Sequence, residues 1–301
     1  MPVTLKQMAA FYWTATLGGF SEASARLNLA QSTVSKRVIE LEETVGAPLI
    51  DRSTRVLRLT RAGEASLAIA AEMLALETRF REAAGGPGLF TGAFRFGVTE
   101  LVALTWLPAL VMAMTADYPN LVPEPEVAGS VDLFDKLRAS EIDLAIGLDP
   151  PTGQELTMVP LDSVRLEWMC APGFGPPEDR IALARLADYP ILTQAQGSGL
   201  QSLVLDWAVA NGLQANRVVQ CNSLNVLAGL AASGLGITFL TAAYFQPEID
   251  SGRLRVIATD PPIPPIQYFA VHRRDDVSPL PARIAALAQR CCDFSQRSLG
   301  R

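Results

Sequence analysis

The sequence predicts a small helical head, a long linker helix, and a larger α/β part made of two lobes. Three observations support this prediction. Two short helical segments and an arginine-rich hairpin follow one another within residues 17–63. Residues 60–84 then contain no proline and a single glycine, as expected for one long helix. From residue 94 onwards, strand-like and helix-like segments alternate, which is typical of open α/β sheets.

The head begins with a helix-turn-helix pattern. Ser21 is a good N-cap residue for a short helix over residues 21–28, and a turn at residues 29–30 follows. The next helix carries one apolar stripe at spacings i, i+4, i+7 and i+11, and Gly46 stands where a left-handed residue ends many helices. The stripe consists of Val34, Val38, Leu41 and Val45.

The other faces of this second helix are polar, which suits a recognition helix in the major groove of DNA. A hairpin follows, with strands near residues 48–52 and 56–59, so the order is helix, turn, helix and wing. Arginines in such a wing are expected to meet phosphates or to enter a narrow minor groove. The predicted DNA-binding residues are Gln31, Ser32, Thr33, Ser35, Lys36 and Arg37 in the helix, with Arg52 and Arg55 in the wing.

The charge distribution separates the head from the rest of the chain. Residues 1–63 contain eight basic and five acidic residues, a net charge of +3, whereas the whole chain carries −6. Residues 64–301 therefore carry −9. A basic head on an acidic body indicates that one module contacts nucleic acid, and the modest excess favours two heads acting together.

The head also contains an ungapped series of residues with a familiar spacing: Leu5, Phe11, Gly18, Phe20, Ala23, Ala25, Leu27, Gln31, Val34, Ser35, Leu41, Glu42, Gly46, Leu49, Arg52, Leu59, Thr60, Ala62 and Gly63. This series resembles the LysR-type family of bacterial transcriptional regulators. The resemblance implies an all-α winged helix-turn-helix head, a dimerising linker helix, and a two-lobed α/β effector-binding domain of the periplasmic-binding-protein-like type. It covers essentially the whole chain, because 301 residues is the family's usual size.

We therefore expect a DNA-binding transcriptional regulator that a small-molecule effector controls. The alternative is a ligand-binding α/β protein whose head binds a protein partner, and the arginine wing with the polar helix face favours DNA. The expected domains are a head over residues 1–60, a linker helix and hinge over 61–88, and an effector-binding domain over 89–301, in which lobe I takes about 89–160 and 268–301 and lobe II about 161–267.

The linker segment from Thr60 to Ala84 is alanine-rich and apolar on more than one face. Leu67, Ala71, Leu74 and Arg81 indicate a heptad seam in this helix. Because a monomer rarely leaves such a helix uncovered, we expect a homodimer or a homotetramer. The glycine- and proline-rich run at residues 85–88 predicts a hinge.

Two sets of strands and helices follow the hinge. The predicted strands are 94–99, 124–128, 142–146, 164–170, 191–193, 218–221, 237–240 and 268–272, and the predicted helices are 104–118, 131–140, 200–211, 224–233 and 281–294. Chain segments that cross near Pro160 and Gln267 would join two lobes around a cleft, and the last strand and helix would return to lobe I.

Ligands of open α/β sheets bind beyond the carboxyl ends of the strands. This rule predicts an effector site whose residues come from both lobes. Helix N-termini near two of these residues favour an anionic group, whereas the carboxylate among them favours an amine, so the class of the effector stays open. The predicted effector-binding residues are Thr99, Glu100, Ser130, Gly147, Gln196 and Ser198.

Enzymatic function is not expected, and we nominate no catalytic residue. The sequence has no P-loop, GxSxG or HExxH motif, and Gly234-Leu235-Gly236 lies between a helix and a strand, the reverse of a dinucleotide fingerprint. The four cysteines lack CxxC spacing, and the one histidine, His272, is expected at the surface or at a strand end. These features argue against a zinc site, and we expect neither metal nor cofactor.

The location of the protein follows from what its sequence lacks. No uncharged run reaches the roughly 18 residues of a membrane span, and the N-terminus has no signal-peptide pattern. We therefore expect a cytoplasmic protein without a membrane partner. A peroxide-sensing relative would carry two cysteines near residues 197–207, and this sequence has none there.

Overall fold

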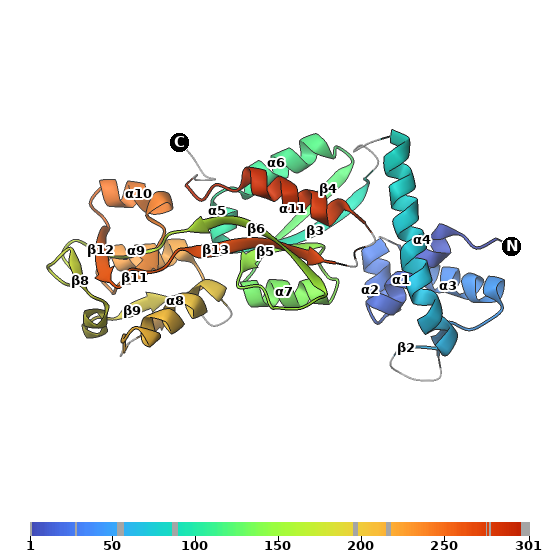
Figure 1. Cartoon of the computed structure of the whole chain (residues 1–301), viewed down its shortest axis with the longest axis horizontal. Coiled ribbons are helices and arrows are strands. Elements are labelled where there is room, and N and C mark those ends of the chain that lie inside the picture. Colours follow the sequence, from blue (N-terminus) through green and yellow to red (C-terminus); the bar gives the residue numbers. More distant parts are fainter. Residues whose placement is uncertain are drawn as a thin grey trace.

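The computed structural model describes residues 2–27, 29–52, 57–85, 90–194, 198–214, 218–274, 276 and 278–295. The molecule is elongated, with the head at one end, lobe I in the middle and lobe II at the other end (Figure 1). None of the helices in the described residues is long and apolar enough to cross a membrane.

The head consists of three helices and a small two-stranded wing. Its elements are α1 (Leu5–Thr16), α2 (Phe20–Leu27), α3 (Gln31–Val45), β1 (Ile50–Asp51) and β2 (Arg58–Leu59). The stripe residues Val34, Val38 and Leu41 are buried in one core, and Gly46 ends α3 at φ 73°, as predicted. The fourth predicted stripe residue, Val45, is instead 46% exposed at the end of the helix. The N-cap prediction for Ser21 was wrong. Helix α2 already begins at Phe20, and its first turn closes two residues before Ser21, where the N–H of Ala23 donates to the carbonyl of Gly19.

Helix α4 (Arg61–Gly85) is joined to the wing by a close backbone contact. The Thr60 hydroxyl accepts a hydrogen bond from the N–H of Gly63 at 3.0 Å and donates one to the carbonyl of Pro48 at 2.7 Å. A Cβ atom at residue 63 would overlap the carbonyl oxygen of Leu49. The threonine and the glycine therefore fix the direction in which α4 leaves the head.

The two apolar faces of α4 have different surroundings. Ala70 is buried in the core of the head with Leu67 packed against that core, and Leu74 is buried as well. The predicted seam through Leu67 and Leu74 was therefore wrong, because these side chains pack within their own chain. A second set at helical spacing is exposed and is called the exposed stripe below: Ile69, Met73, Leu76 and Phe80. The side chain of Arg81 and the predicted hinge at 86–88 lie outside what the structure describes.

Lobe I contains a five-stranded sheet in the order β4-β3-β5-β13-β6. Strand β3 pairs in parallel with β4 and β5, whereas β13 is antiparallel to both β5 and β6. Helices α6 and α11 cover one face and α7 covers the other (Figure 1). The bounds are β3 (Gly92–Val98), α5 (Glu100–Leu104), α6 (Leu107–Asp117), β4 (Leu121–Val127), α7 (Ser130–Arg138), β5 (Leu144–Leu148), β6 (Leu156–Val164), β13 (Ile266–Arg273) and α11 (Leu280–Cys291).

Lobe II contains a four-stranded sheet in the order β11-β7-β12-β8, and β9 pairs in parallel with β10. One hydrophobic core extends through both lobes. The bounds are β7 (Glu167–Cys170), β8 (Arg180–Ala182), the 3-10 helix η2 (Leu183–Asp188), β9 (Ile191–Thr193), α8 (Gly199–Ala210), β10 (Val218–Gln220), α9 (Leu224–Ala232), β11 (Thr238–Leu240), α10 (Ala242–Asp250) and β12 (Arg255–Asp260).

Several elements differ from those predicted. The strand expected over 164–170 is shorter, because β7 begins only at Glu167, and residue 164 is the end of the preceding strand β6. The helix expected over 104–118 begins later, at Leu107, as α6. Strands β6, β8 and β12, helices α1, α5 and α10 and the 3-10 helix η2 were not predicted at all. His272 does lie near the end of β13, but it is buried, and burial lowers the pKa of its imidazole.

Gly63→Ala is expected to lower the free energy of unfolding by about 1–3 kcal/mol, because the new methyl group would overlap a backbone atom that has no room to move. Gly229→Ala is the matched control. This glycine lies in α9 with open space around its Cα, so alanine should stabilise by about 0.4–1 kcal/mol. Calorimetry of the full chain measures both changes, and an unaltered melting temperature for Gly63→Ala would contradict the proposed contact.

Candidate nucleic-acid interface and effector pocket

The outer face of α3 carries the predicted DNA-binding side chains. Gln31, Ser32 and Lys36 are exposed, while Thr33, Ser35 and Arg37 are half-buried. The ammonium group of Lys36 lies 3.9 Å from a carboxylate oxygen of Glu40, but the lysine side chain is 77% exposed, so this pair holds it only weakly. The helix thus offers hydrogen-bond donors and acceptors to a partner on its outer side.

The carboxylate of Glu42, in α3, holds the wing by hydrogen bonds, a role that the sequence analysis did not assign to it. One oxygen of Glu42 accepts hydrogen bonds from the N–H groups of Leu49 and Ile50 at 2.8 and 3.0 Å, and the other accepts one from Arg52 at 3.1 Å. Arg52 is therefore partly engaged in holding the wing, although its side chain remains accessible. Arg55 lies outside the described residues.

A pocket of about 400 Å³ lies between the two lobes. Lobe I contributes the residues after β3 and the first turn of α7, and lobe II contributes the start of α8 and the start of α9. Four of the predicted effector-binding residues line it, namely Thr99, Glu100, Ser130 and Ser198. Gln196 lies outside what the structure describes.

Ser130 stands at the point where the lobes meet. Its hydroxyl accepts a hydrogen bond from the N–H of Leu148 at 3.1 Å, which fixes the start of α7 against the end of β5. A Cβ atom at Gly199, in lobe II, would lie only 3.1 Å from the same hydroxyl. Gly147 does not line the pocket. It lies beneath Ser130, where a Cβ atom would come within 2.9 Å of the hydroxyl oxygen.

The carboxylate of Glu100 bridges the lobes. Its two oxygens accept hydrogen bonds from the N–H of Leu224, at 2.8 and 3.0 Å, and one also accepts from the side-chain amide of Gln194 at 3.2 Å. Burial raises the pKa of this carboxyl group, and the hydrogen bond from Leu224 opposes that effect. A lobe I carboxylate thus occupies the N-terminus of α9, where partial positive charge favours it.

Three further side chains complete the polar lining. Ser198 caps α8 and donates a hydrogen bond to Gln194 at 2.6 Å, so the serine and Glu100 share this glutamine as a partner. The hydroxyl groups of Thr99 and Tyr268 lie 3.5 Å apart. Burial raises the pKa of Tyr268, which keeps its phenol protonated. Sequence reasoning missed both Gln194 and Tyr268. Gln194 directly follows the predicted strand 191–193, so the rule of strand ends could have found it, whereas Tyr268 begins a predicted strand instead of following one.

The pocket is acidic. Among the described residues that line it, the charged side chains are Glu100 and Asp132, and no lysine, arginine or histidine is present. Asp132 lies in the first turn of α7. Four helices begin at the pocket, namely α5, α7, α8 and α9. Three of them, α5, α7 and α9, therefore already have a carboxylate of the chain near their N-terminus.

Comparison with known proteins gives a consistent result. Residues 5–64 match the family described as bacterial regulatory helix-turn-helix protein, lysR family, and residues 87–293 match the LysR substrate binding domain. A probable hydrogen peroxide-inducible genes activator of Streptomyces viridosporus is 32% identical over 83% of this chain and 82% of its own. The regulator CbbR of Rhodospirillum rubrum is 27% identical over 97% of this chain and 98% of its own.

The fold is shared with solved regulators. A full-length OxyR variant from Pseudomonas aeruginosa superimposes with a TM-score of 0.67 at 23% identity and covers 100% of both chains. The two family matches together span the head and both lobes. The chain therefore belongs to the LysR family of DNA-binding transcriptional regulators, in which a helix-turn-helix head is combined with an effector-binding domain.

Proposed function

We propose that α3 reads base edges and that the wing contacts the DNA backbone. The proposed base-reading residues are Gln31, Ser32, Ser35 and Lys36, with Thr33, Arg37, Arg52 and Arg55 at phosphates. The exposed polar face of α3 carries this proposal, because its apolar face is buried in the head. The proposed domains remain residues 1–60, 61–88 and 89–301, and a protein partner for the head finds no support in the family match.

We further propose that the pocket between the lobes binds the effector. The observation that carries this proposal is that both lobes line one pocket. A molecule that touches Thr99, Ser130 and Ser198 would stabilise one arrangement of the lobes over others, which is how a ligand shifts a conformational equilibrium. Glu100 would then interact with the ligand and, through its hydrogen bonds to lobe II, would also respond to a change in the arrangement of the lobes.

The charges of the pocket favour an effector that carries an amine or another cationic group. An added carboxylate would meet Glu100 and Asp132 without a basic side chain among the described lining residues to compensate. The helix N-termini that could attract an anion already have these carboxylates close to them at α7 and α9. A cationic group would lower the repulsion between the two acids.

The exposed stripe of α4 supports a homo-oligomer. Ile69, Leu76 and Phe80 are 58%, 57% and 74% exposed, which is unusual for large apolar side chains on one helical face. We propose that this stripe packs against its copy in a homodimer or a homotetramer and places two heads on one operator. The proposed location is the cytoplasm of a bacterial cell, where the DNA is.

A thiol-based peroxide response is not part of this proposal, although one relative is named as a peroxide-inducible activator. The sequence has no cysteine between Cys170 and Cys221. Burial raises the pKa of Cys170 and Cys291, and it raises the pKa of Cys292 to about 11. These three thiols therefore stay protonated at neutral pH, where protonated thiols react slowly.

Lys36→Ala is expected to weaken binding to an operator selected from random duplexes by about 1–3 kcal/mol, and binding to random DNA much less. Arg55→Ala should weaken both kinds of binding and lower the salt dependence by roughly one unit of slope, if it meets a phosphate. Lys6→Ala, on α1, is the control for loss of a head lysine. Fluorescence anisotropy at several salt concentrations gives these values. Equal losses on all sequences for Lys36→Ala would contradict its role in reading bases.

Leu76→Glu is expected to dissociate the oligomer, because it places a charge in an apolar seam without a partner, at a cost of several kcal/mol. Ala68→Glu adds the same charge to the same helix about 110° away from the centre of the exposed stripe, and should keep the wild-type mass. Sedimentation velocity measures both. A Leu76→Glu protein of wild-type mass would exclude this helix as the interface.

Glu100→Gln is expected to weaken binding of a cationic effector by roughly five- to ten-fold, about 1–1.4 kcal/mol, because it removes one negative charge from the pocket. The effector is first identified by a thermal-shift screen of amines, acids and neutral metabolites, and its affinity is then measured by calorimetry. Glu141→Gln, an exposed change on lobe I outside the pocket, should leave the affinity unaltered. Tighter binding of an acid to Glu100→Gln would instead identify an anionic effector.

A further inference from the structure

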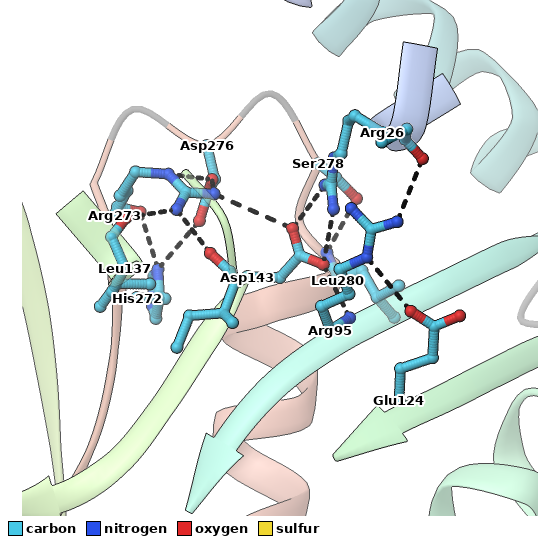
Figure 2. Close-up of polar contacts among 12 residues, drawn as sticks. Arg26, Arg95, Glu124, Leu137, Asp143, His272, Arg273, Asp276, Ser278 and Leu280 are labelled. Carbon is cyan, nitrogen blue, oxygen red and sulfur yellow. Dashed lines mark hydrogen bonds and ion pairs between the residues drawn. The ribbon is translucent and has the colours of Figure 1, made fainter. Parts of the chain in front are cut away.

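The head touches lobe I through an ion pair that belongs to neither the DNA-facing helix nor the effector pocket. Arg26, in the last turn of α2, reaches Asp143, which directly precedes β5 (Figure 2). The two guanidinium nitrogens donate to the two carboxylate oxygens at 3.1 and 2.5 Å. Their side chains are only 16% and 6% exposed, so the pair is shielded from solvent. Such a two-bond pair fixes orientation as well as distance.

Asp143 is held rigidly on the lobe I side. The N–H of Arg95, in β3, donates to one of its oxygens at 3.0 Å, and the N–H of Asp143 donates to the carbonyl of Arg95 at 2.7 Å. Arg273, at the end of β13, lies 3.9 Å from the other oxygen. The same arginine donates to the carbonyls of Leu137 and Ile142 at 2.7 and 2.8 Å. The carboxylate therefore has little freedom to follow the head if the head moves.

Two arginines cross the junction in opposite directions. Arg26 extends from the head and is held over the ring of Trp13, with 4.6 Å from the guanidinium carbon to the ring centroid. Arg95 extends from lobe I and donates to the carbonyl of Ala25 at 3.1 Å, while Glu124 holds its guanidinium at 3.1 Å (Figure 2). Since Ala25 lies in the last turn of α2, this cation also meets the negative end of the helix.

The junction and the effector pocket are joined by two neighbouring strands. Strand β5 starts after Asp143 and ends at Leu148, which lines the pocket. Strand β13 runs in the opposite direction, from the pocket residue Tyr268 to Arg273 at the junction. The strands pair residue by residue, with Tyr268 opposite Leu148. A five-residue strand spans roughly 16 Å, so one short rigid unit connects both places.

We propose that Arg26 is a positioning residue for the DNA-binding head. With Asp143 and Arg95 it holds α2 in one orientation on lobe I, at the end of the strands that line the effector pocket. A change in the pocket would then alter the orientation of the head through these strands. The transmission of the effector signal rests on the proposed function, whereas the contact between head and lobe does not.

The first experiment is hydrogen exchange of the full chain without ligand or DNA. Arg26→Ala should accelerate exchange of lobe I peptides around residues 139–146, and Asp143→Asn should accelerate exchange of α2, each by about ten-fold or more. Effects in the opposite domain are the decisive readout, because local damage would stay in the mutated one. Arg26→Lys keeps the charge and should restore part of the protection.

Arg290→Ala is the matched control for this experiment. It removes another arginine–aspartate pair of lobe I, with Asp117 at 3.3 Å, but one that is exposed. Arg290 lies in the last turn of α11, whereas the first residue of that helix, Leu280, is the one near Arg26 and Asp143. It should leave exchange of α2 at the wild-type rate. If Asp143→Asn and Arg290→Ala gave the same α2 exchange, the head would not be held by this pair and the proposal would be overturned.

The second experiment tests transmission. In the wild type, the effector found by the thermal-shift screen should change operator affinity, and in Arg26→Ala this change should fall to within about two-fold. The affinity for the effector itself, measured by calorimetry, should be retained. A full operator response in Arg26→Ala would overturn transmission through this contact. A wild-type protein that binds no screened compound would contradict the proposed effector pocket. In that case the hydrogen-exchange experiment would still test whether Arg26 and Asp143 hold the head on lobe I.

Discussion

The pairing of β13 with β5 and β6 is the constraint on which both functional regions depend. β13 comes from the far end of the chain, after all of lobe II, and inserts between two strands that lie more than 100 residues earlier. Its insertion completes the sheet of lobe I and returns the chain from lobe II. One end of it brings Tyr268 to the effector pocket, and the other brings Arg273 to the junction with the head. Loss of this pairing would therefore remove a wall of the pocket and a support of Asp143 together.

The lobes themselves are held by polar contacts that the chain makes with its own helix ends. Glu100 accepts from the first N–H of α9, and Ser130 and the first residue of α8 are in close contact. These contacts are small in number compared with the apolar core that extends through both lobes. A ligand therefore does not have to break the core to act. It has only to change the balance among a few hydrogen bonds, which are individually worth about 1 kcal/mol.

The sequence predicts best those features that local signals determine. Three of the four residues of the apolar stripe of α3, its glycine end at Gly46 and the order helix, turn, helix and wing are confirmed, because each depends on residues within one or two helical turns. The interacting face of α4 was not predictable in this way. Both faces are apolar, and only the tertiary structure determines that Leu67 and Leu74 face inward while Leu76 faces outward. Strand β12 was missed for a related reason, since four of its six residues are exposed or partly exposed and its partners are distant.

Polar contacts between residues far apart in the sequence are harder still to predict from the sequence. The rule of strand ends led to Thr99, Glu100 and Ser130, but it gave no sign that Glu100 accepts from Leu224, 124 positions away. Likewise, nothing near Arg26 in the sequence indicates Asp143, 117 positions away. From their neighbours in the sequence alone, Glu100 and Arg26 would each be interpreted as a solvated surface residue. Its partner becomes apparent only when the fold brings the two elements together.

Helix α2 connects the core of the head with lobe I. On one side Ala23 is fully buried in the core of the head, which also contains Val34 and Val38 of α3. Three residues further along, Arg26 is bound to lobe I. Because an interior core is closely packed, α2 cannot rotate on lobe I without carrying α3 with it. The short supporting helix of the motif therefore links the orientation of the DNA-facing helix to the end of a strand whose other end lines the effector pocket.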